Sequence, residues 1–394
     1  MGRNYSHGRV GRVSQTIGGF DVDTAVRFIT KDEIDRLQRF LERSYGHGRD
    51  FFLRYYPELQ EIAPECSMVI DADAGIAAHV GVYPRTLRVG PSIVTCGGIG
   101  GVATAVDQRG KGLMSRLMLE AIKHMREKGW SLSVLWGDRQ RYQHFGYQTC
   151  GIKYNLVITR RSLQRAHVQP DDSVEEVDKS SPEVIKRLEE LSSMIEFGTQ
   201  RRRLDLILSR PAARVFMGDG GYLISLKDRS GDLEVTEVFS NTNSEAELTF
   251  GALNWSFGNA ANVELSAAQT ESCLRLSRVC NYWRVSPQGM FRIINWPQLV
   301  QELAPFLSLR AVGLQPFDIS IGCRWEGSTE WATVEWDGTE LSVRPGRYAN
   351  LDVELCNPRL SGLLFGGPFG DTRQLGLFGH LLPIPIHIPN IDHV

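Results

Sequence analysis

Apolar residues recur at both strand-like and helical spacing over the first 160 positions of the chain. Residues 26–29 (Val-Arg-Phe-Ile) are apolar apart from Arg27 and predict a short strand. Thr30 followed three residues later by Glu33 forms a capping box, which predicts that a helix begins there. The apolar positions of this helix recur at helical spacing at Ile34, Leu37, Phe40 and Leu41. A short helix over 50–56 and strands over 67–70, 77–83 and 86–89 are expected to follow.

The clearest element of the sequence is a helix that begins near Leu113. One continuous apolar stripe defines it, made by Leu113, Met114, Leu117, Met118, Ala121, Ile122 and Met125. Gly129 supplies a stop. A glycine-rich strand and a glycine loop precede the helix, and residues 130–136 alternate as a half-buried strand after it. The order strand, glycine loop, helix, strand indicates a βαβ-like unit.

The remainder of the chain shows the same mixed pattern after a polar stretch at 164–179, which is typical of a domain junction. Its predicted helices are 183–194, 204–208, 245–255, 271–279, 297–303 and one from Pro358. Its predicted strands are 222–227, 234–239, 319–325, 332–336, 341–343 and 351–355. The end of the chain combines prolines with isoleucines, and we expect it to form a stiff apolar strand that is buried.

Composition and charge narrow the function classes. The 394 residues suggest two to four domains, and a net charge of −2 argues against binding nucleic acid, which requires a basic surface. The run 201–203 is three arginines, which form either a solvated surface or a local anion site. Seven scattered cysteines without a C-x-x-C pair match neither a disulfide framework nor a zinc site. They favour a reducing compartment, so we expect a cytoplasmic protein with no metal. No apolar run is long enough to span a membrane.

The segment 102–114 carries the main chemical signal. Gly110 and Gly112 allow the backbone to approach a ligand closely. The helix from Leu113 adds unsatisfied N–H groups and the positive end of its dipole. Together they favour an anion site suited to a pyrophosphate, although a glycine turn that merely caps the helix is the simpler alternative. The glycine spacing matches neither a P-loop nor a dinucleotide fingerprint.

This segment resembles motif A of the GCN5-related N-acetyltransferases (GNAT), written R/Q-x-x-G-x-G/A, with Arg109 and Gly112 at its first and fourth positions. Met114 stands where most members have a small residue, and the enhanced-intracellular-survival (Eis) subgroup tolerates a larger one. Residues 141–147, Arg-Tyr-Gln-His-Phe-Gly-Tyr, resemble the Y-x-x-F-G-Y segment that follows the fifth strand in that subgroup. Length and layout also resemble Eis-like proteins.

The resemblance implies an α/β (α+β) chain of two tandem GNAT domains followed by a domain like sterol carrier protein 2 (SCP2). The corresponding parts are a flexible N-terminal tail (1–24), a GNAT domain with the CoA loop (25–159), a degenerate second GNAT domain (160–289) and the SCP2-like domain (290–394). The implied activity is transfer of an acetyl group from acetyl-CoA to a primary amine of a small molecule or peptide. The residues implied to bind acetyl-CoA are Val102, Ala103, Thr104, Arg109, Gly110, Lys111, Gly112, Leu113, Met114 and Ser115.

The resemblance also implies two catalytic groups. Tyr142 matches the general acid, and the terminal carboxylate of Val394 takes the place of the base, with Asp392 and His393 as alternatives. For Tyr142 the simpler alternative is an aromatic packing residue. Rival functions are a lipid or acyl-CoA binding protein that uses the SCP2-like domain, and a long-chain N-acyltransferase. Because relatives often associate, a homo-oligomer also remains open.

Overall fold

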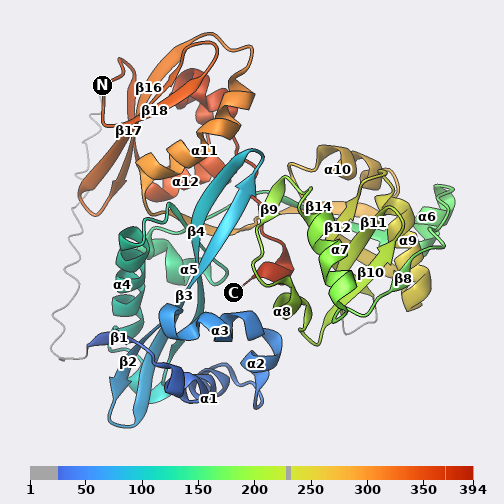
Figure 1. The fold of residues 1–394 in the computed structure, drawn as a ribbon. Helices are drawn as coiled ribbons and strands as arrows, with labels where there is room; N and C mark the ends of the chain where they lie inside the picture. The colour runs from blue at the N-terminus through green and yellow to red at the C-terminus, as the bar shows by residue number, and fades with distance from the viewer. Residues whose placement is uncertain (1–24, 228–231, 369, 394) are drawn as a thin grey trace, which may run out of the picture.

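The chain folds around three β-sheets, which Figure 1 shows as three bodies that surround the C-terminal end of the chain. The computed structural model describes residues 25–227, 232–368 and 370–393. The tail predicted over residues 1–24 lies outside the described residues. Within the described part, no helix combines the length and the apolar character needed to cross a bilayer.

The first sheet contains the predicted βαβ unit. Its strands lie in the order β1 (Val26–Phe28), β2 (Ser67–Ala72), β3 (Gly75–Val89), β4 (Ser92–Thr104), β5 (Leu132–Leu135), β15 (Gly289–Ile293) and β6 (Gln148–Cys150), and β9 (Phe197–Thr199) also pairs with β3. Its helices are α1 (Ile34–Tyr45), α2 (Phe51–Tyr55), α3 (Pro57–Cys66), α4 (Leu113–Glu127) and α5 (Arg139–Tyr142). All adjacent pairs on the main path are antiparallel except β4 and β5, which are parallel and joined by α4. The capping box at Thr30 and Glu33 is present as predicted.

The second sheet repeats this arrangement strand by strand. Its order is β8 (Glu175–Glu176), β10 (Ala213–Gly218), β11 (Gly221–Lys227), β12 (Leu233–Ser240), β13 (Ala260–Ser266), β7 (Lys153–Thr159) and β14 (Tyr282–Ser286). Its helices are α6 (Arg160–Arg165), α7 (Pro182–Ser192), α8 (Leu204–Leu208), α9 (Glu245–Ser256) and α10 (Thr270–Ser277). The single parallel pair is again the central one, β12 with β13, and α9 connects them as α4 connects β4 and β5. The two sheets are therefore two copies of one topology.

The two copies exchange one strand with each other. In the first sheet the position between β5 and β6 is filled by β15, which follows the second copy in sequence. In the second sheet the equivalent position, between β13 and β14, is filled by β7, which follows the first copy. The predicted boundaries at 159/160 and 289/290 remain predictions. The first sheet takes its sixth strand, β15, from the region at and after the boundary at 289/290. The second sheet takes its sixth strand, β7, from the region before the boundary at 159/160.

The third sheet has four strands in the order β18 (Leu341–Pro345), β17 (Ser328–Trp336), β16 (Phe317–Trp325) and β19 (Asp352–Cys356). Helices α11 (Trp296–Ala311) and α12 (Asn357–Phe365) accompany it. Its buried residues, such as Ile321, belong to the same hydrophobic cluster as Trp296 of α11 and as part of the first sheet, including Leu132 and Phe291. The Trp296 ring lies within that cluster and donates its Nε1–H to the carbonyl of Ile321 at 2.7 Å. The first and third sheets thus share one core.

The sequence prediction omits α3 and several strands, among them β7, β10, β14 and β15, and three further elements differ from their predicted form. β3 runs unbroken through Pro84, which is tolerated because β2 pairs with β3 only as far as Gly81 and β9 begins at Leu87. α11 continues to Ala311 through Pro305 instead of ending at residue 303. The apolar tail is buried, with Ile384, Ile386 and Ile388 almost inaccessible, but it forms no strand. Its prolines lack the N–H groups that a ladder needs.

Buried histidines give the fold a predictable pH dependence. His387 in the tail is 6% exposed, its Nδ1 lies 3.2 Å from Oε1 of Gln288, and burial lowers its pKa to about 3. In the unfolded chain the imidazole takes up a proton near pH 6.5, whereas in the folded chain it stays neutral. The free energy of unfolding therefore falls as the pH drops below 6.5. Between pH 6 and pH 4.5 we expect His387→Gln to reduce the slope of the free energy of unfolding against pH by about 1.4 kcal/mol per pH unit. Urea unfolding at several pH values measures this slope. His144→Gln, at an exposed site, is the control. An unchanged slope in His387→Gln would contradict the assignment.

Candidate active site

The first sheet opens where its two parallel strands separate. β4 and β5 pair from Cys96 with Leu132 to Ile99 with Leu135, where β5 ends. β4 continues for five more residues to Thr104 without a β5 partner. Ligands of open α/β sheets bind in crevices beyond the carboxyl ends of parallel strands. The free edge of β4 at 100–104 therefore lies where a ligand is expected.

The loop between β4 and α4 forms the second wall of this opening. Gly110 and Gly112 have φ angles of 79° and 72°, in the left-handed region that favours glycine. Gly112 is the N-cap of α4, and its carbonyl accepts the first helical bond from the N–H of Arg116 at 3.0 Å. The preceding N–H groups of the first turn have no partner within the helix. Such N–H groups, together with the positive end of the helix dipole, form a place where an anion can bind.

A cavity of about 510 Å³ lies between the β4 edge and this loop. The predicted ligand residues that line it are Val102, Ala103, Thr104, Arg109, Gly110, Gly112, Leu113, Met114 and Ser115. Lys111 is not among the lining residues, and its Nζ donates to Oε1 of Gln108 at 2.8 Å. The cavity also has lining residues that the sequence did not point to, namely Ser44, Tyr45, Gln108 and Arg141. Arg141 stands inside the predicted 141–147 motif, but no spacing connects Ser44 and Tyr45 to the loop.

Tyr142 is the last residue of α5, next to the cavity-lining Arg141. It is 6% exposed and belongs to the hydrophobic cluster that also contains Leu135 and the buried face of α4. Burial raises the pKa of its phenol, and the charge of Arg141 opposes this shift only in part. The phenol therefore keeps its proton at neutral pH, as a general acid must.

The C-terminal end of the chain reaches the same region. Trp136 directly follows β5, and the ring of His393 stacks on it with centroids 3.7 Å apart and an angle of 20°. Burial is the main cause that lowers the pKa of His393 to about 3, so this imidazole is neutral and weakly basic at pH 7. Val394, the predicted position of the catalytic carboxylate, lies outside the described residues.

Asp392 is an anchor of the tail. Its Oδ1 and Oδ2 accept from Nε and Nη2 of Arg201 at 2.9 and 2.8 Å, and its side chain is 1% exposed. Burial alone would raise its pKa, but Arg201 outweighs burial and holds the pKa below the usual value. Because both carboxylate oxygens are engaged, the expectation that Asp392 is an alternative base is wrong.

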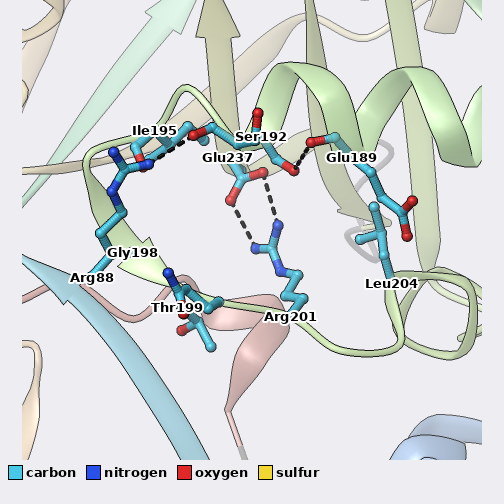
Figure 2. A pocket seen from close by; sticks show the side chains of 11 residues that line it. Arg88, Glu189, Ser192, Ile195, Gly198, Thr199, Arg201, Leu204 and Glu237 are labelled. Carbon is cyan, nitrogen blue, oxygen red and sulfur yellow. Dashed lines mark hydrogen bonds and ion pairs between the residues drawn. The ribbon is translucent and has the colours of Figure 1, made fainter. Parts of the chain in front are cut away.

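Of the arginine run, Arg202 and Arg203 are exposed, as a solvated surface requires, and Arg201 departs from that expectation. It is buried rather than solvated, and it donates to both carboxylate oxygens of Glu237 at 3.0 and 2.7 Å (Figure 2). Figure 2 shows this pair at a cavity of about 480 Å³, which Arg88 of β3 and Glu189 of α7 also line. The Arg88 guanidinium donates to the carbonyl of Ser193 at 2.7 Å. This polar cavity therefore lies between the first and second sheets.

The second copy of the fold has a counterpart of the cavity at β4. It measures about 300 Å³ and is lined by the end of β12, the start of α9 and residues of α10. No glycine loop precedes α9, and the first helical residue is Glu245, which is 3% exposed. Its carboxylate accepts from Ser272 at 2.6 Å and from Arg275 at 2.8 and 3.0 Å. The protein's own carboxylate thus already occupies the N-terminus of α9, whereas Gly112 stands at the N-terminus of α4.

Comparisons with known proteins agree with this geometry. Residues 25–150 match the acetyltransferase (GNAT) domain family. Among solved structures, a GCN5-related N-acetyltransferase from Kribbella flavida has a TM-score of 0.70 and 18% identity, covering 94% of this chain and 98% of its own. A GCN5-related N-acetyltransferase from Anabaena variabilis has a TM-score of 0.69 and 18% identity, and the match covers 94% of this chain and 100% of that one.

Eis1 from Mycobacterium abscessus has a TM-score of 0.62 and 13% identity, covering 89% and 91%. At these identities the likeness establishes the fold. No curated protein matches the sequence. The matched segment contains β4, the glycine loop, α4 and Tyr142. Residues 25–150 therefore form a GNAT acetyltransferase domain, and the chain is an acyltransferase.

Proposed function

We propose that this chain transfers an acetyl group from acetyl-CoA to a primary amine, and that it is an Eis-like member of the superfamily. The observation that carries the proposal is the cavity that joins the free edge of β4 to the N-terminus of α4. It combines a backbone edge for the amides of pantetheine with an anion site for the pyrophosphate. The similarity in fold to Eis1 over most of both chains supports the Eis-like assignment.

The proposed binding mode assigns the cavity residues to parts of acetyl-CoA. Backbone groups of Val102 and Thr104 bind the pantetheine arm. Ala103 faces the other way, and its packing with the buried side of α1 supports this. The amides of residues 109–114 hold the pyrophosphate, and the hydroxyl of Ser115 adds a further donor. Arg109 contributes positive charge at the loop.

In the proposed reaction the amine nitrogen attacks the thioester carbonyl directly. The carbon–sulfur bond then breaks, and Tyr142 donates its proton to the departing thiolate. The raised pKa of this tyrosine supports the role, because the phenol is protonated at neutral pH. The proposed base is the terminal carboxylate of Val394, which removes the proton from the attacking nitrogen. The stacking of His393 on Trp136 supports it, since the preceding residue already lies beside the end of β5.

For residues 290–394 we propose an SCP2-like fold with a structural role. Its apolar side chains share one cluster with the first sheet, and β15 completes that sheet. This sharing supports a role in stability over the lipid-carrier alternative.

Two glycine variants test the proposal. Gly112→Ala and Gly129→Ala both place a Cβ at a left-handed residue, with φ values of 72° and 69°, at opposite ends of α4. Both variants therefore bear a similar backbone strain of about 1 kcal/mol. Only Gly112 faces the cavity, so we expect Gly112→Ala to weaken acetyl-CoA binding by about tenfold or more.

The measurement is the thermal shift with acetyl-CoA, because a ligand of the folded state raises the midpoint. Gly129→Ala should keep the wild-type shift. A wild-type chain that shows no shift, or equal shifts in both variants, would contradict the proposed site. Release of free thiol over a panel of amines then identifies the acceptor.

A further inference from the structure

β4 contains a bulge at the point where it borders the cavity. Ala103 pairs with His79 of β3, and Gly100 pairs with Gly81. Gly101 and Val102 therefore oppose the single residue Val80. Gly101 has a φ of 61°, and a Cβ there would lie 3.0 Å from the ring of His79. Bulges of this kind redirect the backbone groups of a strand.

His79 holds the first carbonyl of the bulge. The side chain is fully buried, and its Nδ1 lies 2.7 Å from the carbonyl oxygen of Gly101. Because a carbonyl only accepts, Nδ1 carries the proton of the ring. Burial lowers the pKa of His79 to about 4, so the ring is neutral. Its Nε2 is buried without a hydrogen-bond partner in the described part of the chain. Burying the unpaired Nε2 is unfavourable, and the hydrogen bond from Nδ1 to the Gly101 carbonyl offsets this cost.

Tyr45 holds the second carbonyl from another direction. It is the last residue of α1, it lines the cavity, and its hydroxyl donates to the carbonyl of Val102 at 2.9 Å. Tyr45 is 45% exposed, and the partial burial of its phenol raises the pKa to about 12, so the hydroxyl remains a donor at neutral pH. The other contacts of Tyr45 are to rings, with His47 and Phe52 at 6.2 and 5.8 Å between centroids. Two consecutive carbonyls of β4 are thus fixed by side chains of two different elements.

We propose that His79 and Tyr45 are positioning residues that fix the direction of the β4 bulge, so that the backbone at 102–104 presents its groups to the pantetheine arm of acetyl-CoA. This inference rests on the proposed function and adds to it two residues that no motif indicated. Neither residue takes part in bond making. Both act through the backbone of β4, which otherwise has no partner strand beyond Ile99 on the β5 side. Loss of either bond should therefore affect the pantetheine part of the ligand and leave the diphosphate part unaffected.

Three variants and two ligands separate this role from simple packing. Tyr45→Phe removes only the hydroxyl, and His79→Leu removes the donor to Gly101. His79→Asn keeps a side-chain N–H close to the position of Nδ1. Tyr55→Phe, in the neighbouring α2, is the matched control. The ligands are acetyl-CoA and ADP, which carries the diphosphate without pantetheine, and the Kd of each is measured by calorimetry.

We expect Tyr45→Phe and His79→Leu to raise the Kd and the KM for acetyl-CoA by about five- to tenfold, as the loss of one hydrogen bond predicts. The Kd for ADP and kcat should change less than twofold, and His79→Asn and Tyr55→Phe should resemble the wild type. Equal losses for both ligands, or no loss for acetyl-CoA, would overturn the positioning role. A wild-type chain that binds neither ligand would overturn the proposed function itself.

Discussion

Replacing Tyr142 with phenylalanine should lower kcat by about 10²- to 10³-fold, the range for loss of a positioned general acid. The ring is buried at the end of α5, so phenylalanine fills the same space and only the proton donor is lost. The KM for acetyl-CoA should change little, because phenylalanine leaves the residues that line the cavity, including Arg141, unchanged. Steady-state kinetics by thiol release measure both quantities.

The matched control is Tyr147→Phe, in the same motif. Tyr147 is 1% exposed, and its hydroxyl lies 2.8 Å from Oγ of Ser133. Its loss should reduce the free energy of unfolding by about 1 kcal/mol and leave kcat near the wild-type value. If Tyr142→Phe retains the wild-type kcat, Tyr142 is a packing residue, which is the alternative that the sequence left open.

Local patterns predicted the loop and the helix that line the cavity at α4. The stripe on α4 and the capping box at Thr30 were predictable because they depend on residues three or four positions apart. The glycine loop was predictable for the same reason, and the cavity residues at the loop and the start of α4 all lie between positions 108 and 115. Such short-range signals fix the type of an element and the chemistry of a single loop.

Long-range pairing could not be predicted in this way. β7 and β15 have ordinary strand patterns, and nothing in them specifies that each enters the other copy's sheet. Tyr45 meets Val102 across 57 positions, and only the folded sheet brings them together. In the tail, the local pattern predicted an element that does not form. Its isoleucines alternate as in a strand and were correctly predicted to be buried, but Pro383, Pro385 and Pro389 prevent a ladder.

Arg201 links this tail to the second copy of the fold, and its replacement by methionine should be strongly destabilising. The guanidinium joins Asp392 of the tail to Glu237 of β12, and the hydroxyl of Tyr222 donates to Glu237 at 2.6 Å. All three charged side chains are less than 10% exposed. Arg201→Met leaves two buried carboxylates uncompensated, so we expect a loss of about 3–5 kcal/mol in the free energy of unfolding.

Neighbouring substitutions separate this ion pair from general effects of charge. Arg203 stands two residues away and is 46% exposed, as is its partner Glu61, so Arg203→Met should leave stability nearly unchanged. Adding Asp392→Asn and Glu237→Gln to Arg201→Met removes the uncompensated charges and should recover part of the loss. Urea unfolding of the wild type, Arg201→Met, Arg203→Met and the triple variant measures these differences. Loss of equal size in Arg201→Met and Arg203→Met would contradict the buried ion pair.

The same variant series tests whether the tail belongs to the active site. The tail is also held by Lys153, whose Nζ donates to Oδ1 of Asn390 at 3.0 Å, and by Arg210, which donates to the carbonyl of Ile391 at 2.5 Å. Among the described residues, Arg201 is the hydrogen-bond partner of the Asp392 side chain, and Asp392 directly precedes His393, which stacks on Trp136. In folded Arg201→Met/Asp392→Asn/Glu237→Gln we expect kcat to fall at least tenfold, because the end of the chain loses its fixed position beside β5. The Kd for acetyl-CoA should stay within twofold, since the cavity at α4 has no residue of the tail. A wild-type kcat in this variant would remove the tail from the mechanism.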